Sequence, residues 1–552
     1  MLKLNRNHTI KISVKDDRIK HDSTLTGELK LSEGKYPNFD AISIPYDHAG
    51  WNQLPSKVDS IKCLTENGQQ LTLIECICEV GEVAPRYVKS GWDDEIIHTV
   101  SFSLAGLSKW FLQRKADLEK AKNTTDSKAT LFSFDLVFKH NEYIVSCFVD
   151  KSISNDKETD VESVFIEFKA NKSLSLNEVE WLVIDSKHLF SIILGRPLVT
   201  EQVKVNGREF YFSSPKIREI EVTTSRDELS NASLLLHNEL WEKIFTSCFV
   251  DKRHEFKNIW LKIPLYMSYD HISDLEVMSF VSILEAKSTI FANESEKSLP
   301  KEERKKLLND LKLVVAGFKE KNTSEENSKI YDTISDSFGF TVKSTSIHTF
   351  KDKIKHLIDS LHEDIKSIFN LSTQEINQLV EIRNASAHGR FAKYKDNINS
   401  YQLENKLKLF LLYLAHRDLG ISDQHFCKQL NYSLNRIKLN AGLNRMLVDK
   451  LSGDVQFLDV SKADWDLINN SNLNTFALLH RGDSYEYLSE ISEIISKDWP
   501  SQTKHRQLDA FVKELYAPYG DAEVRYVGGL YVQYESSTKR LFQACFVKPL
   551  AL

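Results

Sequence analysis

The sequence predicts an α+β protein of several domains: a β-rich, sandwich-like N-terminal region, a central all-α bundle and a small C-terminal α+β module. Three observations support this division. Up to residue 230, apolar residues largely alternate with polar ones, as they do in half-buried strands. From there to residue 440 they recur at the spacing of amphipathic helices. Beyond it, short helical and strand patterns are mixed, so we expect domains at 1–230, 231–440 and 441–552.

The composition is that of a globular protein. A chain of 552 residues exceeds what one hydrophobic core usually serves, so several domains are expected. The N-terminal stretch lacks the apolar run of a secretion signal, and no apolar run approaches the length that spans a membrane. Seven cysteines are scattered without a disulfide framework, which fits a reducing compartment. We expect a cytoplasmic protein with no membrane partner.

In the N-terminal region, the strand signal comes from apolar residues at every second position. Ile10, Ile12 and Val14 alternate with polar residues, and the segment 132–138 repeats the pattern with larger side chains. The segment 203–212 predicts a hairpin, because Asn-Gly at its centre suits a type I′ turn. Strands of this kind are expected to form a sandwich or a pair of packed sheets.

The central region predicts a bundle of antiparallel helices. Apolar residues recur at helical spacing in 275–284 and 403–414, and 301–321 is expected to form one or two charged helices. The segment 350–369 has the cleanest amphipathic pattern in the chain and is expected to form one helix. Since the connections between these segments are short, neighbouring helices should run antiparallel.

The most informative stretch of this bundle is 372–390, a predicted helix with marked ends. Ser372 followed three residues later by Glu375 is a capping box, and Gly389 is a typical residue for a left-handed cap. Between them, an apolar stripe through Ile376 continues at helical spacing into polar positions. These positions are Arg383, Asn384, Ala387 and His388. An arginine, an amide and an imidazole where burial is expected indicate a functional site.

Arg383-Asn384 followed by His388 resembles the signature of HEPN-domain ribonucleases. A β-rich region followed by this motif is also similar to the layout of ApeA-type antiphage HEPN proteins. The resemblance implies a helical HEPN bundle and a metal-independent endoribonuclease effector of bacterial abortive-infection defence. It further implies RNA as the substrate, with tRNA as one candidate, and a homodimer or larger oligomer assembled through the HEPN helices. The N-terminal domain would then sense a phage-protein trigger or restrain the enzyme.

The three motif residues suit RNA cleavage without a metal or cofactor. His388 can exchange protons near neutral pH, and Arg383 can hold two phosphate oxygens at once. Together with Asn384 they are the expected catalytic residues, and attack by the 2′-hydroxyl would leave cyclic phosphate and 5′-hydroxyl ends. On an ideal helix Arg383 and His388 lie about 140° apart. Unwinding at Gly389 and the length of the arginine are expected to close part of this gap. Pairing with a second copy of the helix, which the resemblance implies, would close the rest.

A local excess of basic residues follows the motif, although the whole chain carries a net charge of −6. Between 383 and 417, only Asp396 and Glu404 oppose these basic residues: Arg383, Arg390, Lys393, Lys395, Lys406, Lys408 and Arg417. Such an excess can bind an RNA backbone. We expect Arg390, Lys393 and Lys395, which are next to the motif, to bind RNA, and a solvated basic face is the alternative.

Other interpretations remain open. Arg383 and His388 could form a polar contact inside a non-catalytic HEPN bundle that dimerises, docks RNA or binds another protein. Adjacent acids at Asp93, Asp94 and Glu95 could belong to a glycosidic or carbohydrate-binding N-terminal domain, although a polar loop explains them as well. Cys76 and Cys78 lack a second pair of ligands for zinc, so buried small side chains are expected there.

Overall fold

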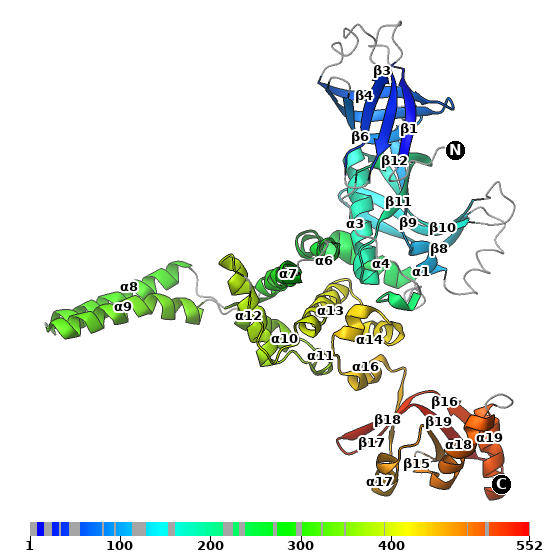
Figure 1. Cartoon of the computed structure of the whole chain (residues 1–552). Coiled ribbons are helices and arrows are strands. Elements are labelled where there is room, and N and C mark those ends of the chain that lie inside the picture. Colours follow the sequence, from blue (N-terminus) through cyan, green and yellow to red (C-terminus); the bar gives the residue numbers. More distant parts are fainter. Residues whose placement is uncertain are drawn as a thin grey trace. The chain divides into compact units, whose positions relative to one another are not determined.

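The computed structural model describes residues 8–15, 25–32, 35–43, 56–79, 82–92, 95–112, 128–152, 161–213, 225–230, 238–268, 273–293, 301–321, 324–346, 349–390, 392–482, 484–502 and 507–550. The protein is of the α+β class (Figure 1). It divides into two compact units, Met1–Leu443 and Asn444–Leu552. The first unit contains both the β-rich region and the helices that follow it.

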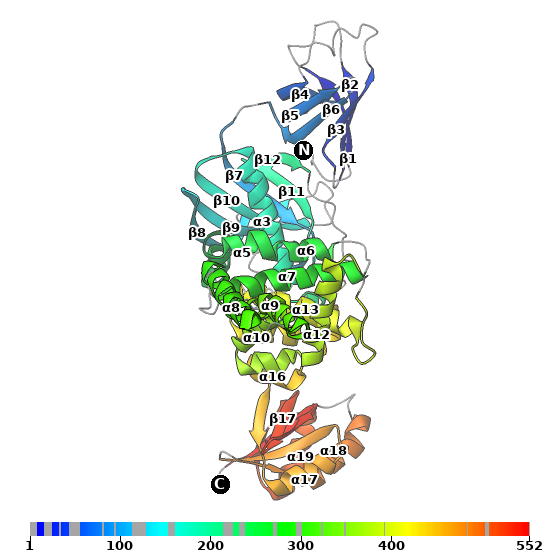
Figure 2. The same ribbon diagram turned by 90° about the vertical axis from the view of Figure 1, so that its left-hand side faces the viewer.

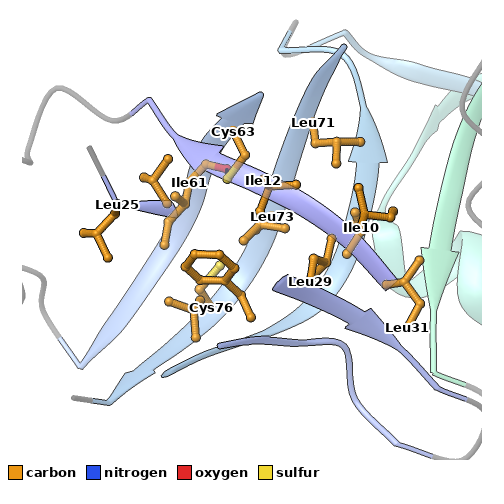
Figure 3. Close-up of a cluster of buried hydrophobic side chains, with 14 of the residues drawn as sticks. Ile10, Ile12, Leu25, Leu29, Leu31, Ile61, Cys63, Leu71, Leu73 and Cys76 are labelled. Carbon is orange, nitrogen blue, oxygen red and sulfur yellow. Dashed lines mark hydrogen bonds between the residues drawn. The ribbon is translucent and has the colours of Figure 1, made fainter. Parts of the chain in front are cut away.

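The first six strands form an antiparallel ring. They are β1 (His8–Val14), β2 (Thr26–Leu31), β3 (Asn38–Ser43), β4 (Lys57–Thr65), β5 (Gln70–Glu79) and β6 (Glu82–Ser90). The strand order is β3-β2-β1-β4-β5-β6, and β6 also pairs with β3, which closes the ring. Alternate side chains fill its interior, including Ile10 and Ile12 of β1 (Figure 3). Cys63 and Cys76 are buried in this core as well, so the expectation of small buried side chains is confirmed for Cys76.

The same sheet continues beyond the ring in the order β12-β11-β7-β10-β9-β8. These strands are β7 (Ile97–Leu104), β8 (Lys128–Phe138), β9 (Asn141–Ser152), β10 (Val161–Leu174), β11 (Thr200–Val205) and β12 (Arg208–Phe212). Asn206 and Gly207 join β11 to β12 with positive φ angles of 46° and 78°. The two-residue turn predicted for this hairpin is therefore confirmed.

The expected sandwich is wrong, because helices rather than a second sheet cover the apolar face of the β7–β10 region. α4 (Asn238–Thr246) packs on β8. Its Trp241 ring stacks on Phe132 with centroids 4.9 Å apart, and Phe245 lies 5.4 Å from Phe134. The short helix α1 (Leu107–Phe111) contacts β10 and β7. The predicted alternation of apolar residues is correct, but it did not identify the layer that covers them.

The sequence pattern also failed to predict α3 (Leu176–Leu194), a helix within the strand-rich region. A capping box between Ser175 and Glu178 starts it, and Gly195 in a left-handed conformation ends it. The helix packs against β7 on one side and against a helix of the bundle, α13 (Ser400–Asp418), on another. Because it is buried nearly all round, its apolar residues show no clear period of 3.6.

The helical region follows α4. Two π-helical turns, η4 (Ser247–Asp251) and η5 (Phe256–Trp260), lead through α5 (Arg253–Glu255) to α6 (Lys262–Met267). The main helices are α7 (Ser273–Asn293), α8 (Lys301–Lys321), α9 (Glu325–Ser346), α10 (Phe350–Asp359), α11 (Glu363–Phe369), α12 (Thr373–Ala387), α13 (Ser400–Asp418), α14 (Asp423–Tyr432) and α15 (Arg436–Asn440). α7 is central, because α10, α12 and α13 all pack against it.

The segment 350–369 forms two helices instead of the single one expected. α10 ends at Asp359 and α11 begins at Glu363. The ring Nδ1 of His362 accepts a hydrogen bond from the Asp364 N–H at 3.3 Å and caps the second helix. A capping side chain in mid-segment restarts the helix without disturbing the apolar spacing, which is why the pattern looked continuous.

The second unit is a small α+β module. Its elements are α16 (Arg445–Ser452), β13 (Gln456–Asp459), α17 (Lys462–Asn470), β14 (Thr475–Arg481), β15 (Ser484–Tyr487), α18 (Ser489–Gln502), α19 (Leu508–Tyr516), β16 (Ala522–Val527), β17 (Leu530–Tyr534), β18 (Ser537–Leu541) and β19 (Gln543–Pro549). The strands form sheets of order β13-β17-β18 and β15-β14-β19-β16. Across the described part of both units, no helix combines the length and the apolar character needed to cross a membrane.

Candidate functional site

The candidate site is built on α12, whose two ends are fixed by local sequence. At its start, the Ser372 hydroxyl accepts a hydrogen bond from the Glu375 N–H (3.1 Å), and the Glu375 carboxylate accepts one from the Ser372 N–H (2.8 Å). At its end, Gly389 adopts a left-handed backbone with a φ of 65°. The Gly389 N–H and the next one donate to carbonyls of the preceding turn. The predicted capping box and glycine stop are both confirmed.

The face of α12 that packs into the bundle is not the one that the periodicity predicted. The buried apolar residues are spaced by three: Ile376, Leu379, Ile382 and Ala385. On a 3.6-residue helix each three-residue step turns the line by about 60°. The buried line therefore winds away from the motif face. Arg383 is partly exposed and Asn384 and His388 are exposed, so the expectation that this face is buried is wrong.

Arg383 is held by a carboxylate from a neighbouring helix. Its Nη2 donates to Oε1 of Glu285 on α7 at 2.9 Å, and its Nε lies 3.2 Å from both carboxylate oxygens. Its Nη1 donates to Oδ1 of Asn384 at 3.4 Å. Hydrogen bonding of the Arg383 guanidinium to the Glu285 carboxylate raises the pKa of Arg383. Glu285 thus occupies one edge of the guanidinium, while the edge formed by Nη1 and Nη2 stays directed away from it.

His388 lies at the end of the same helix. The helix is regular through Ala387, and His388 follows as its C-cap with φ −104° and ψ 12°. Because the helix does not unwind before Gly389, Arg383 and His388 remain about 140° apart when the helix is viewed down its axis. Both side chains reach solvent, so a long substrate can contact one after the other along the surface of α12.

The loop that follows α12 is tied back to it by a buried glutamine. Gln378 is fully buried, and its Nε2 donates to the Lys393 carbonyl at 3.0 Å. Its Oε1 accepts a hydrogen bond from the Lys395 N–H at 3.3 Å. A buried amide that satisfies both a carbonyl and an N–H of one loop fixes the path of that loop. Arg390, Lys393 and Lys395 are exposed on it, next to the motif face.

Two lysines assigned to the basic excess do not face solvent. Lys406 is buried and its Nζ lies 2.7 Å from Glu375. Lys408 is also buried, between Glu404 of its own helix and Glu276 of α7. Their charges are therefore neutralised inside the bundle. The basic surface beside the motif therefore consists of the exposed loop residues named above; Arg417 is also exposed, but it lies at the end of α13 that is remote from this loop.

The position of α7 is secured two residues beyond Glu285. Lys287 donates to the Asp418 carboxylate of α13 at 2.6 Å, and the Trp260 ring N–H donates to the same oxygen at 2.8 Å. The Lys287 ammonium also lies 5.4 Å from the centre of the Trp260 ring. This network joins α7, α13 and η5, so the helix that carries Glu285 is held in place two residues beyond it.

Among the residues that the structure describes, no three His, Cys, Asp or Glu side chains are grouped so that they could hold a metal ion. Of the three acids considered for glycosidic chemistry, Asp93 and Asp94 lie outside the described residues, and Glu95 is exposed and lies 3.8 Å from Arg208. A separate cavity of about 550 Å³ lies on the outer face of the sheet at β7, β9, β10 and β11. It is lined by Thr99, Ser101, Phe148, Asp150, Phe165, Glu167, Lys169, Lys204, Asn206 and Gly207.

The sequence pattern predicted that Arg383, Asn384 and His388 lie on one helix. It did not identify Glu285 and Gln378 as residues of the site. A glutamate in the apolar run VMSFVSILEAKSTIF and a glutamine beside Leu379 were the only signals available for them. Both are polar residues at positions that burial favours. In comparisons with protein-family models, curated proteins and solved structures, nothing matches the chain.

Proposed function

We propose that this chain is a metal-independent endoribonuclease of the HEPN type, in which Arg383 binds the scissile phosphate and His388 transfers protons. The observation that carries the proposal is the outer face of α12. It presents a carboxylate-held arginine, an amide and an imidazole to solvent, beside a basic loop that a buried glutamine fixes in place. Arginine for phosphate, imidazole for protons and a basic surface for the backbone are the groups that RNA cleavage requires.

The chemistry follows from the donors that Arg383 leaves open. With its Nε and Nη2 edge on Glu285, the remaining edge can donate one N–H from each Nη to two phosphate oxygens. This contact stabilises the negative charge that grows on phosphorus as the 2′-hydroxyl attacks. His388 takes the 2′-hydroxyl proton or protonates the leaving 5′-oxygen, and a second imidazole, from another copy of the chain, does the other task. The products are a 2′,3′-cyclic phosphate and a 5′-hydroxyl.

In the cell, this activity would make the chain an effector of antiphage defence, with tRNA as one candidate substrate and the N-terminal sheet as the part that senses or restrains. These assignments rest on the resemblance to ApeA-type proteins. An oligomer assembled through the motif helices stays a prediction, and burial on α12 gives no separate support for it. The apolar half of α12 is buried within one chain and the polar half is exposed, so neither half requires a partner.

Purified protein incubated with total RNA in EDTA tests the proposal. We expect cleavage with 5′-hydroxyl ends, and a loss of at least about 100-fold in His388→Ala, because proton transfer by a side chain contributes 10²–10⁴-fold. The matched control is His98→Ala, which removes another exposed imidazole from the sheet. Products with 5′-phosphates, strict dependence on magnesium, or full activity in His388→Ala would each contradict the assignment.

A second function is favoured by one observation: the Arg383–Glu285 pair joins α12 to α7, as a purely structural ion pair would. On this alternative the bundle is a non-catalytic docking or interaction module. It predicts that total RNA stays intact in the presence of the wild-type chain, whatever its affinity. The cleavage assay therefore separates the two functions directly.

A further inference from the structure

The helices α8 and α9 form a hairpin within the helical region. Only three residues separate Lys321 from Glu325, and the two helices lie side by side in both views (Figures 1 and 2). They therefore run antiparallel. Among the described elements, each packs extensively only against the other. Val315 of α8 and Val342 of α9 are buried in this contact, and their stripes are continued by partly buried residues such as Leu311 and Tyr331.

A second apolar stripe on each helix is exposed. On α8, Leu307 and Val314 are seven residues apart, and on α9, Ile330 and Ile334 are four apart. These four side chains are between 38% and 57% exposed, and Phe318 (53%) extends the α8 stripe by one turn. Residues spaced by four and seven share one helix face, so each helix presents a continuous apolar line. In proteins, most of the stability of a helix comes from packing an apolar line of this kind against a partner.

Helix geometry places both lines on the same side of the hairpin. Viewed down the helix axis, the exposed line of α8 lies about 70° from its buried line, and the exposed line of α9 lies about 100° from its own. In both helices this rotation is opposite in sense to the turn from one residue to the next. Because the helices run antiparallel, the same sense of rotation leads to the same side of the pair. The opposite side carries the Lys319–Asp332 ion pair, with Nζ 2.7 Å and 2.8 Å from the two carboxylate oxygens. The hairpin thus has one charged, closed side and one apolar, open side.

The net charges of the two helices are opposite. α8 has seven Lys and Arg against four Asp and Glu, a net charge of +3. α9 has two Lys against four Asp and Glu, a net charge of −2. An uncharged partner helix would gain nothing from this asymmetry. A second copy of the hairpin does, because a two-fold axis can set each α8 over the α9 of the other copy, where opposite charges attract.

We propose that the apolar side of the α8–α9 hairpin docks on the same side of the hairpin in a second copy of this chain. The product is an antiparallel four-helix bundle whose core includes Leu307, Val314, Ile330 and Ile334 from both copies. Two hairpins together supply the four helices of such a bundle, and the contact is self-complementary as two-fold symmetry requires. The inference does not rest on the proposed nuclease function, and it concerns a surface distinct from the motif face.

Neighbouring residues on α8 supply a matched test. Val314 lies on the open apolar side, whereas Leu313, 71% exposed, lies nearly opposite the contact with α9. The full-length chain, Val314→Glu, Ile330→Glu and Leu313→Glu are compared by light scattering and sedimentation, with circular dichroism to confirm helix content. We expect the wild type and Leu313→Glu to be dimers with similar dissociation constants. Val314→Glu and Ile330→Glu should weaken dimerisation at least about 100-fold, because each buries two carboxylates in an apolar core.

The remaining outcomes overturn the proposal in different ways. A wild-type chain that is monomeric at all concentrations removes it. A dimer that survives in both Val314→Glu and Ile330→Glu places the contact elsewhere, including on the motif helices. Equal weakening by Leu313→Glu would show that the effect is not specific to one side. If the wild type is monomeric and Val314→Glu lowers affinity for RNA, the apolar side binds RNA instead. None of these readouts depends on cleavage.

Discussion

Glu285 of α7 and Arg383 of α12 form a two-point contact across the bundle, with the guanidinium Nη2 2.9 Å from the carboxylate. Arg383 itself is 40% exposed, so water screens the pair and its contribution to stability is about 0–1 kcal/mol. Its larger effect is on orientation. A carboxylate on the Nε edge fixes the plane of the guanidinium, and this determines where the remaining N–H groups point.

Replacing Glu285 with glutamine should lower cleavage by about 100-fold while the fold is retained, because loss of orientation at a catalytic group costs about this much. The amide presents an NH₂ group to the Nη2 donor, so the two-point contact is lost. Rates on an RNA that the wild type cleaves, measured as kcat and KM, check this. We expect kcat to fall more than KM rises. A faster Glu285→Gln enzyme would mean instead that Glu285 competes with RNA for Arg383.

Glu180→Gln is the control for this change. Glu180 accepts a hydrogen bond from Arg86 at 2.9 Å and is likewise partly exposed, but it lies on α3 beside the sheet. Removing its charge should leave cleavage unchanged. A similar loss in both variants would show that the assay reports a general weakening of ion pairs.

Arg383→Lys should reduce cleavage by at least about 100-fold, a loss typical of removing one donor to a transition-state oxyanion. Lysine keeps the positive charge, but its ammonium cannot bind Glu285 on one edge and two phosphate oxygens on the other. Arg86→Lys is the matched control, since Arg86 is equally exposed and also pairs with a carboxylate. Turnover of Arg383→Lys at the wild-type rate would make Arg383 a structural residue.

The bundle should lose stability in mild acid because of His416 in α13. Its ring is fully buried, its Nδ1 lies 2.8 Å from the Leu412 carbonyl, and burial lowers its pKa to about 4. In the unfolded chain the pKa of histidine is about 6.5. Between these values the unfolded state binds more protons than the folded state, so stability falls as the pH falls.

Urea unfolding of the full chain between pH 7.5 and pH 4.5 measures this effect. Each unit below the unfolded pKa should cost about 1.4 kcal/mol for this one group. The variant His416→Leu, which cannot take up a proton, should show a shallower dependence by about that slope, even if it is less stable at pH 7.5. Identical slopes for the two chains would mean that His416 keeps its ordinary pKa in the fold.

The sequence was informative where structure is decided locally. The capping box at Ser372, the stop at Gly389 and the turn at Asn206 each depend on hydrogen bonds or backbone angles within a few residues, and all are observed. The α+β class and the bounds of α8 also follow from short-range periodicity. The catalytic assignment itself depends on solution chemistry and stays a prediction.

Predictions failed where the outcome depends on residues distant in sequence. Which face of α12 is buried depends on α7, whose Glu285 lies 98 residues before Arg383. The same helix supplies Glu285 to Arg383 and Glu276 to Lys408. Closure of the first six strands depends on β3 meeting β6. A charge count along 383–417 cannot show that Glu375, outside that window, neutralises Lys406.

The loop after α12 should supply most of the salt-dependent RNA affinity. Gln378 fixes this loop, and Arg390, Lys393 and Lys395 are exposed on it. Each cation that contacts a phosphate releases a counterion, so log K falls with log salt by about 0.7 per contact for single-stranded RNA. In a His388→Ala background, which binds without cleaving, replacing all three by alanine should reduce the salt slope by about 2. Fluorescence anisotropy with a labelled RNA at several salt concentrations measures both slopes.

Equal removal of charge elsewhere gives the control. Lys305, Lys306 and Lys312 are exposed on α8, and replacing them with alanine changes the net charge by the same amount. We expect their removal to leave the slope within error of the parent, because affinity follows local contacts rather than net charge at physiological salt. Gln378→Leu should weaken RNA binding without removing any charge, since it frees the loop that places the three cations. If the α8 variant loses as much slope as the loop variant, the RNA path lies along the hairpin and not along α12.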